Sequence, residues 1–212
     1  MEVRLKAYTP GAEEVCADAA AVCTASARPD RALEHAIGAG HASVLEHASF
    51  TFEVEGLSRA ALAQLTRHRL ASFDVQSQRY VRIQAGDLVM PDTIAGSGFV
   101  EEADALMEKV MDLYGRMADA GIPYEDARYI TPQAVPTRLI MTMNARELLH
   151  FFSLRTCNRA QWEIRGLADR MLGLCRAACP RIFGGAGPGC ASSGRCPEKR
   201  PCGHPRSLEE WG

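Results

Sequence analysis

The sequence lacks an excess of basic charge. Its 212 residues include 24 Lys and Arg against 26 Asp and Glu, which gives a formal net charge of -2 at pH 7. Proteins that bind nucleic acids or anionic membranes through general electrostatics carry a basic surplus. The balance disfavours such a function, so the basic side chains matter only where they cluster.

Long apolar runs are also missing. The N-terminal stretch MEVRLKAYTP alternates polar and apolar residues and does not form the apolar core of a signal peptide. No stretch approaches the roughly 20 apolar residues of a transmembrane helix. We therefore expect a soluble, cytoplasmic protein, in which the eight cysteines are reduced thiols or metal ligands.

Three common catalytic and nucleotide-binding motifs are absent. No Ser shows the glycine pattern of a nucleophile elbow with matching His and Asp residues. The segment GHASVLEH, residues 40–47, offers two His and a Glu but not the HExxH order of a helical zinc site. Gly38, Gly40 and Ser43 imitate a dinucleotide fingerprint but follow a predicted helix, not a strand. The loop at residues 40–47 is expected to contact a phosphate or a ring.

The hydrophobic pattern predicts a mixture of strands and helices. Strands are expected at 1–10, 47–56 and 137–144, and helices at 12–26, 29–40, 57–70, 100–120, 144–155 and 160–179. Asn144 followed by Glu147 resembles a capping box at a helix start. Because no linker or repeat interrupts this pattern, one domain is expected over 1–188, followed by a Gly-, Pro- and Cys-rich tail over 189–212.

A basic cluster stands out in RHRLASFDVQSQRY, residues 67–80. An RHR triplet alone is more often a solvated helix end, because cations favour helix C-termini. Guanidinium groups can instead hold a phosphate and the carbonyl edge of a base through paired donors. Side chains that could share this role are Gln64, Gln76, Ser77, Gln78, Arg128 and Arg155.

The predicted helix 144–155 carries polar residues at suggestive positions. Asn144 and Arg155 fall within roughly 20° of one another around a continuous helix, and Arg146 and His150 form an i, i+4 pair. The alternative is a solvated face with incidental charges.

The tail contains a possible metal-ligand set. Cys190, Cys196, Cys202 and His204 are the ligand types of tetrahedral zinc, although their spacing is wider than paired C-x-x-C. A mobile tail of reduced thiols is the alternative.

The basic cluster has the order R-H-R, seven residues, then S-x-R-Y, and resembles the signature of flavin-dependent thymidylate synthases of the ThyX type. The resemblance continues through GHASVLEHASFTFEVEGLSRA, EDARYITP, MNARELLHFFSLR and AQWEIRGLA. It implies an α/β fold of α+β character, with a central, mostly antiparallel sheet flanked by helices and no Rossmann unit.

The resemblance also implies an activity. Family members convert dUMP to dTMP with methylenetetrahydrofolate as one-carbon donor and FAD, reduced by NADPH, as hydride carrier. They are homotetramers with active sites between subunits, and they need no cysteine nucleophile. Cys157, although close to Arg155, is accordingly interpreted as a bystander thiol. The chain departs from many members at Asp74 and Val75, where Asn-Glu is common.

Site residues follow from matching positions. The dUMP-binding positions are Gln64, Arg67, Gln76, Ser77, Gln78, Arg79, Arg128 and Arg155. The FAD-contacting positions are Ser43, Arg67, His68, Arg69, Asn144, Arg146 and His150. The catalytic positions are His41, beside the flavin and folate, Ser77, and Arg155, which stabilises uracil ionised at N3.

Two other classes of function compete with this interpretation. A nucleic-acid-binding module could use the arginines with Tyr80 and Trp162, but it would require steeply salt-dependent affinity, which the acidic balance disfavours. A zinc-stapled interaction protein could be built around the tail. No nucleic acid or membrane partner is expected.

Overall fold

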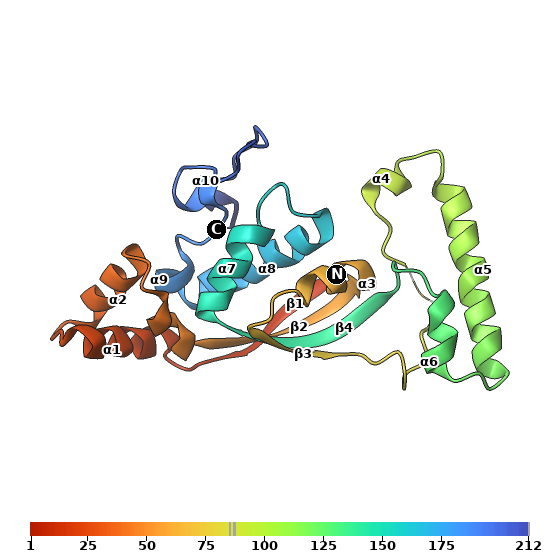
Figure 1. Cartoon of the computed structure of the whole chain (residues 1–212), viewed down its shortest axis with the longest axis horizontal. Helices are drawn as coiled ribbons and strands as arrows, with labels where there is room; N and C mark the ends of the chain where they lie inside the picture. The colour runs from red at the N-terminus through yellow and green to blue at the C-terminus, as the bar shows by residue number, and fades with distance from the viewer. Residues whose placement is uncertain (85, 87, 212) are drawn as a thin grey trace.

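The computed structural model describes residues 1–84, 86 and 88–211. Its centre is a four-stranded antiparallel sheet with the order β1-β2-β4-β3 (Figure 1). The strands are β1 (Glu2–Tyr8), β2 (Ser49–Ser58), β3 (Ala71–Val75) and β4 (Pro136–Asn144). The predicted antiparallel sheet is confirmed. The short strand β3, which lies inside the basic cluster, was not predicted.

One face of the sheet is apolar because the strand residues alternate. On β2, Phe50, Phe52 and Val54 are all fully buried. The opposite face is polar: Thr51 is hydrogen-bonded across to Thr142 at 2.9 Å. This alternation is the one predicted for a strand with one buried face.

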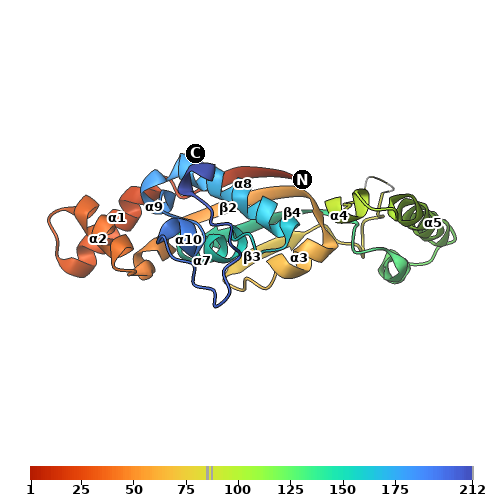
Figure 2. The same cartoon turned by 90° about the horizontal axis from the view of Figure 1, so that it is seen from above.

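Three helices cover the apolar face: α3 (Arg59–Leu65), α7 (Ala145–Arg155) and α8 (Trp162–Ala178). Figures 1 and 2 show α7 and α8 lying side by side over the strands. Phe152 of α7 packs edge-on against Phe183 of the short helix α9 (Pro180–Phe183). The helix predicted at 57–70 is shorter than expected, because Leu57 still belongs to β2 and Ser58 caps α3 by accepting a hydrogen bond from the Ala61 amide.

The two ends of the molecule carry different elements (Figures 1 and 2). One end holds α1 (Ala12–Thr24) and α2 (Pro29–Gly38), with the 3-10 helix η1 (Ala42–His47) packed against them. The other end holds α4 (Asp92–Ala95), α5 (Val100–Asp119), α6 (Tyr124–Ala127) and the 3-10 helix η2 (Arg128–Ile130). The predictions for α1, α2 and α5 are confirmed.

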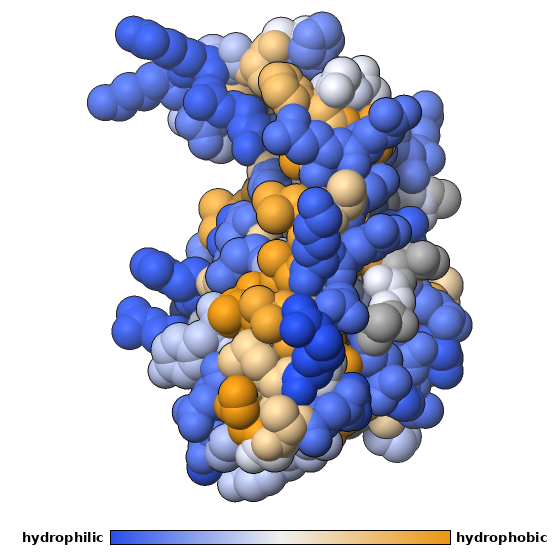
Figure 3. All heavy atoms as spheres, turned by 90° about the vertical axis from the view of Figure 1, so that its right-hand side faces the viewer, coloured by the Kyte–Doolittle hydropathy of each residue, from blue (hydrophilic) through white to orange (hydrophobic). Residues whose placement is uncertain are grey.

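Helix α5 is amphipathic but barely covered. Tyr114 is its one buried residue, and the exposed fractions of Leu106 and Leu113 are 61% and 40%. Phe99, just before the helix, is 70% exposed. Figure 3, which views this end of the molecule, shows apolar side chains in a stripe between polar ones. A face of this kind in water favours contact with another apolar surface.

The C-terminal segment is folded onto α8. It contains α10 (Gly189–Ser192) and the 3-10 helix η3 (Leu208–Trp211). Trp211 is buried to 8% exposure as part of the hydrophobic core. The domain boundary at residue 188 stays a prediction. None of the helices in the described part of the chain combines the length and apolar character needed to cross a lipid bilayer.

Candidate active site

A buried histidine links the basic cluster to α7. His68 follows α3 and is 5% exposed. Its Nδ1 lies 3.0 Å from a carboxylate oxygen of Glu147, and Arg155 Nε lies 3.1 Å from its Nε2. Arginine can only donate, so Nε2 must accept and Nδ1 must carry the proton donated to Glu147. Glu147 thus fixes the tautomer that lets His68 hold Arg155.

Burial sets the charge state of this network. Desolvation lowers the pKa of His68 below 6.5, and the neighbouring Arg155 lowers it further, against the opposing effect of the Glu147 hydrogen bond. Desolvation also lowers the pKa of Arg155, but an arginine stays charged at neutral pH. The result is a neutral imidazole between a carboxylate and a guanidinium.

The terminal nitrogens of Arg155 are available for a ligand. Its Nε is used by His68, while within the described residues neither Nη atom has a protein partner. The ring of His150 on α7 stands 5.9 Å from that of His68. Paired Nη donors next to histidine rings suit the planar edge of a base.

Helix α7 begins at a second group of predicted site residues. Asn144 caps the helix by accepting a hydrogen bond from the Glu147 amide at 2.9 Å. The predicted capping box is half confirmed, because the Glu147 carboxylate faces His68 and does not turn back to the Asn144 amide. Arg146 forms an ion pair with Glu46 of η1, the element that also carries Ser43.

Other predicted site residues lie on the surface or at the ends of helices. Arg67 and Arg69 are exposed, and in the part of the chain described neither guanidinium has a partner. Gln64 precedes them at the end of α3, where its carbonyl accepts from the Arg67 amide at 3.3 Å. His41 lies exposed at the start of η1.

The second half of the basic cluster gathers at α6. Arg79 Nε donates to the Glu125 carboxylate at 2.6 Å, and Arg128 Nε donates to the Glu125 carbonyl at 3.1 Å. Ser77 Oγ accepts from the Arg79 amide at 3.1 Å. Three of the predicted dUMP residues are therefore close together around one glutamate.

Two clefts meet beside this group, and both are lined by Arg59 and Gln78. One of about 220 Å³ also has Gln76 and Ser77 in its wall, and one of about 340 Å³ has Arg128. Arg59 donates to the Gln76 carbonyl at 2.8 Å, yet its buried Nε has no partner in the described structure. Arg59 was not among the predicted site residues, because nothing in its local pattern distinguishes it from a solvated helix start.

The chain brings the predicted residues into separate groups. Arg155 and His68 belong to the helix layer, whereas Arg79 and Arg128 belong to the α6 end of the molecule. No hydrogen bond or ion pair joins the two groups within the described residues. His41 precedes η1 and Ser43 lies on it. Helix η1 packs against α1 and α2 at the opposite end of the molecule and also against α7 (Figure 1).

The predicted zinc ligands are not assembled. Cys190 Sγ accepts from the Arg206 amide at 3.4 Å, while Cys202 is exposed with its Sγ near the carbonyl of His204. Among the residues described, including Cys196, no three His, Cys, Asp or Glu side chains are grouped as a metal would need. The tail is organised around Arg206 and Trp211 instead, and a zinc site formed by these residues stays a prediction.

The eight cysteines are all free, in agreement with the expectation of thiols. Burial raises the pKa of Cys16 and of Cys179 to about 11, and it also raises the pKa of Cys175. These thiols stay protonated at neutral pH and are poor nucleophiles. Cys157 is half-buried in the turn after Arg155.

The fold and site together define a class. An antiparallel sheet without a Rossmann unit presents arginine, histidine and amide side chains that suit an anionic nucleotide. A sequence model for the family described as thymidylate synthase complementing protein matches residues 4–181. The chain belongs to this family.

Individual relatives agree with this membership. A flavin-dependent thymidylate synthase of Geobacter sulfurreducens is 46% identical over 213 residues, which cover 93% of this chain and 91% of that protein. One of Thermococcus onnurineus is 43% identical over 191 residues, with 84% and 78% covered. The crystal structure of the flavin-dependent thymidylate synthase ThyX from Helicobacter pylori, complexed with FAD and dUMP, matches with a TM-score of 0.72. The two sequences are 28% identical, and the match covers 88% of this chain and 100% of the Helicobacter pylori chain.

Proposed function

We propose that this chain is a flavin-dependent thymidylate synthase that works in the cytoplasm. It converts dUMP to dTMP, takes the one-carbon unit from methylenetetrahydrofolate, and uses FAD reduced by NADPH. The observation that carries this proposal is the arrangement of Arg155, whose Nε is fixed by buried His68 while its Nη donors stay available.

The donor set fits FAD. A dinucleotide carries two negative charges on its pyrophosphate, and the exposed guanidinium groups of Arg67 and Arg69 have no partner within the described residues. Arg146 adds a third exposed cation, and His150 adds a ring beside His68. Cationic forks and aromatic rings are the groups that hold phosphates and planar heterocycles. FAD bound there would supply the hydride that completes the new methyl group.

The substrate fits the remaining residues. Arg128 and Arg79 can hold the dUMP phosphate in exchange for Glu125, and Ser77 and Gln78 offer hydrogen bonds to the sugar or the base. Arg155 then acts on the uracil ring: a guanidinium next to N3 lowers the pKa of that position, because it stabilises the negative charge. The ionised ring is richer in electrons at C5, the atom that attacks the one-carbon unit.

Assembly completes the site in this proposal. The apolar face of α5, with Leu106 and Leu113 exposed, is suited to packing against a second copy of the chain. Such a contact closes a dimer, and two dimers joined through a second, different contact form a tetramer. The separation of Arg155 from Arg79 within one chain supports active sites made at subunit interfaces.

An omission assay tests the function. The purified protein is incubated without oxygen with dUMP, methylenetetrahydrofolate, FAD and NADPH, and each is left out in turn while dTMP is measured. Product is expected only when all four are present. Product formed without flavin, or no binding of flavin and dUMP at all, would contradict the proposal.

A further inference from the structure

The C-terminal segment is attached to the turn between α7 and α8. The Asn158 side-chain amide donates to the carbonyl of His204 at 2.8 Å, and Arg159 Nη1 donates to the carbonyl of Arg200 at 2.6 Å. Both donors lie within four residues of Arg155. The tail is thus bonded to the chain immediately after the arginine assigned to the uracil ring.

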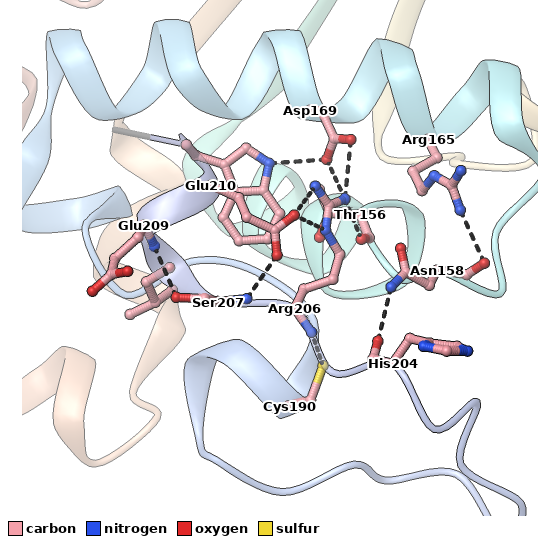
Figure 4. A network of polar contacts seen from close by, with 12 residues as sticks. Thr156, Asn158, Arg165, Asp169, Cys190, His204, Arg206, Ser207, Glu209 and Glu210 are labelled. Atoms are coloured by element: carbon pink, nitrogen blue, oxygen red, sulfur yellow. Dashed lines mark hydrogen bonds and ion pairs between the residues drawn. The ribbon is translucent and has the colours of Figure 1, made fainter.

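Arg206 makes the most direct of these attachments. Its Nη1 donates to the carbonyl of Thr156 at 2.8 Å and to the carboxylate of Asp169 on α8 at 2.7 Å, and its Nε donates to Glu210 at 2.8 Å. Figure 4 shows the guanidinium between these groups. The side chain of Arg206 is only 11% exposed, so these hydrogen bonds are largely shielded from water.

The position of Arg206 matters for α7. Thr156 is the C-terminal cap of α7 and is fully buried. The last carbonyls of a helix have no partner within the helix, and the C-terminus attracts positive charge. Arg206 supplies both a donor and a cation at that point. It thereby fixes the backbone one residue after Arg155.

Trp211 anchors the strap, by which we mean residues 189–211. Its indole Nε1 donates to Asp169 at 2.9 Å, and the Arg206 guanidinium lies 4.4 Å from the ring centroid. Arg176 donates to the carbonyl of Leu208 at 2.5 Å. The end of the strap is therefore buried in the core and bonded to α8, which gives Arg206 a rigid base.

We propose that the strap positions Arg155 for the nucleotide, with Arg206 as the positioning residue. The inference rests on the proposed role of Arg155. Arg155 is held from two sides: His68 fixes its Nε, and Arg206 fixes the carbonyl of Thr156, the next residue along the backbone. Neither attachment alone determines the direction of the Nη donors.

The test compares three variants of the full chain. Arg206→Ala removes the attachment, Arg206→Lys keeps the charge with fewer donors, and Arg195→Ala is the matched control. Arg195 is an exposed arginine of the same segment whose side chain has no partner within the described structure. The measurements are kcat and KM for dUMP, flavin affinity from its absorbance, thermal stability, and amide hydrogen exchange at residues 152–158.

Arg206→Ala is expected to lower kcat/KM for dUMP by about tenfold or more, since small displacements of a catalytic group are costly. Flavin affinity should stay unchanged, and exchange should rise at the end of α7. Arg206→Lys should recover part of the loss, and Arg195→Ala should match the unaltered chain.

Three results would overturn the inference: unchanged exchange at the end of α7, unchanged kcat/KM at a temperature where Arg206→Ala is fully folded, or an equal loss of flavin affinity, which would indicate general loosening. Failure of the proposed function is distinguishable, because the unaltered chain would then form no dTMP. The exchange measurement would still decide whether Arg206 orders the end of α7.

Discussion

Arg155 and Arg79, both assigned to dUMP, are held in contrasting surroundings. Arg155 contacts the buried imidazole of His68, which is fixed in turn by buried Glu147. Arg79 pairs with Glu125 on the surface, where the two side chains are 51% and 44% exposed. The first group is a network shielded from water, and the second is an ion pair in contact with it.

The difference indicates two ways of preparing an arginine for a ligand. An exposed ion pair contributes at most about 1 kcal/mol, so a phosphate can displace Glu125 from Arg79 at little cost. A buried network is costly to disturb, because an unpaired polar group loses its hydration without compensation. We infer that Arg155 is oriented before the substrate arrives, whereas Arg79 is oriented by the substrate when it binds.

Removing Arg155, the arginine oriented before the substrate arrives, should have the largest effect. Arg155→Ala should lower kcat by about 100- to 1000-fold, the range found when one preorganised donor to a developing charge is lost. Its free energy of unfolding should fall by about 1–3 kcal/mol at most, because the buried Nε2 of His68 loses its donor. Arg195→Ala, at an exposed arginine whose side chain has no partner within the described residues, is the control. Normal specific activity with a large loss of stability would show that Arg155 is structural.

Charging the apolar face of α5 tests whether the active site, with Arg79 on the surface, needs a second copy of the chain. A double variant, Leu106→Glu with Leu113→Glu, should reduce the mass in light scattering and reduce activity with it, since a charged face cannot pack against an apolar one. Val22→Glu on α1, at a position 83% exposed, is the matched control. An unchanged mass would place the subunit contacts elsewhere.

Changing Glu147 tests the support behind His68. Glu147→Leu leaves the Nδ1 proton without an acceptor and should lower the free energy of unfolding by about 1–3 kcal/mol, with a fall in kcat. Glu147→Gln keeps an acceptor oxygen and should have the smaller effect on both. Urea denaturation and steady-state assays provide the comparison. Equal effects of the two variants would argue against a hydrogen bond at this position.

Titrating His68 is the mildest way to disturb the network. Its folded pKa is lowered by burial and by Arg155 and His150, against Glu147. Below pH 6.5 the unfolded chain therefore binds a proton that the folded chain does not, and stability falls as the pH falls. The slope from this one group is at most about 1.4 kcal/mol per pH unit. His68→Gln should flatten the slope, and His204→Gln, at an exposed histidine, should not.

Local patterns in the sequence predicted the secondary structure well. The alternation of Phe50 and Phe52 identified β2, and Asn144 identified the start of α7. The strand β3 was missed although Ala71, Phe73 and Val75 alternate with polar residues, because the surrounding charges dominated the interpretation.

Long-range contacts could not be predicted in the same way. The sequence pattern predicts that Glu147 is a capping residue, yet its carboxylate is hydrogen-bonded to His68, 79 positions earlier in the chain. Arg206 and Trp211 lie in a segment without periodicity, so their burial against Asp169 depends on packing that no local spacing reveals. The cysteine types suggested zinc, but the folded tail keeps them apart.

Mixing two inactive variants tests most directly whether Arg155 and Arg79 meet in one active site between two copies of the chain. Arg155→Ala and Arg79→Ala are unfolded and refolded together, and dTMP formation is compared with each variant alone. If one active site takes Arg155 from one subunit and Arg79 from another, the mixture should regain about a quarter of the native activity, since random assembly restores that share of the sites. No recovery, although mixed oligomers have formed, would contradict the account and place both arginines in a site built from one chain.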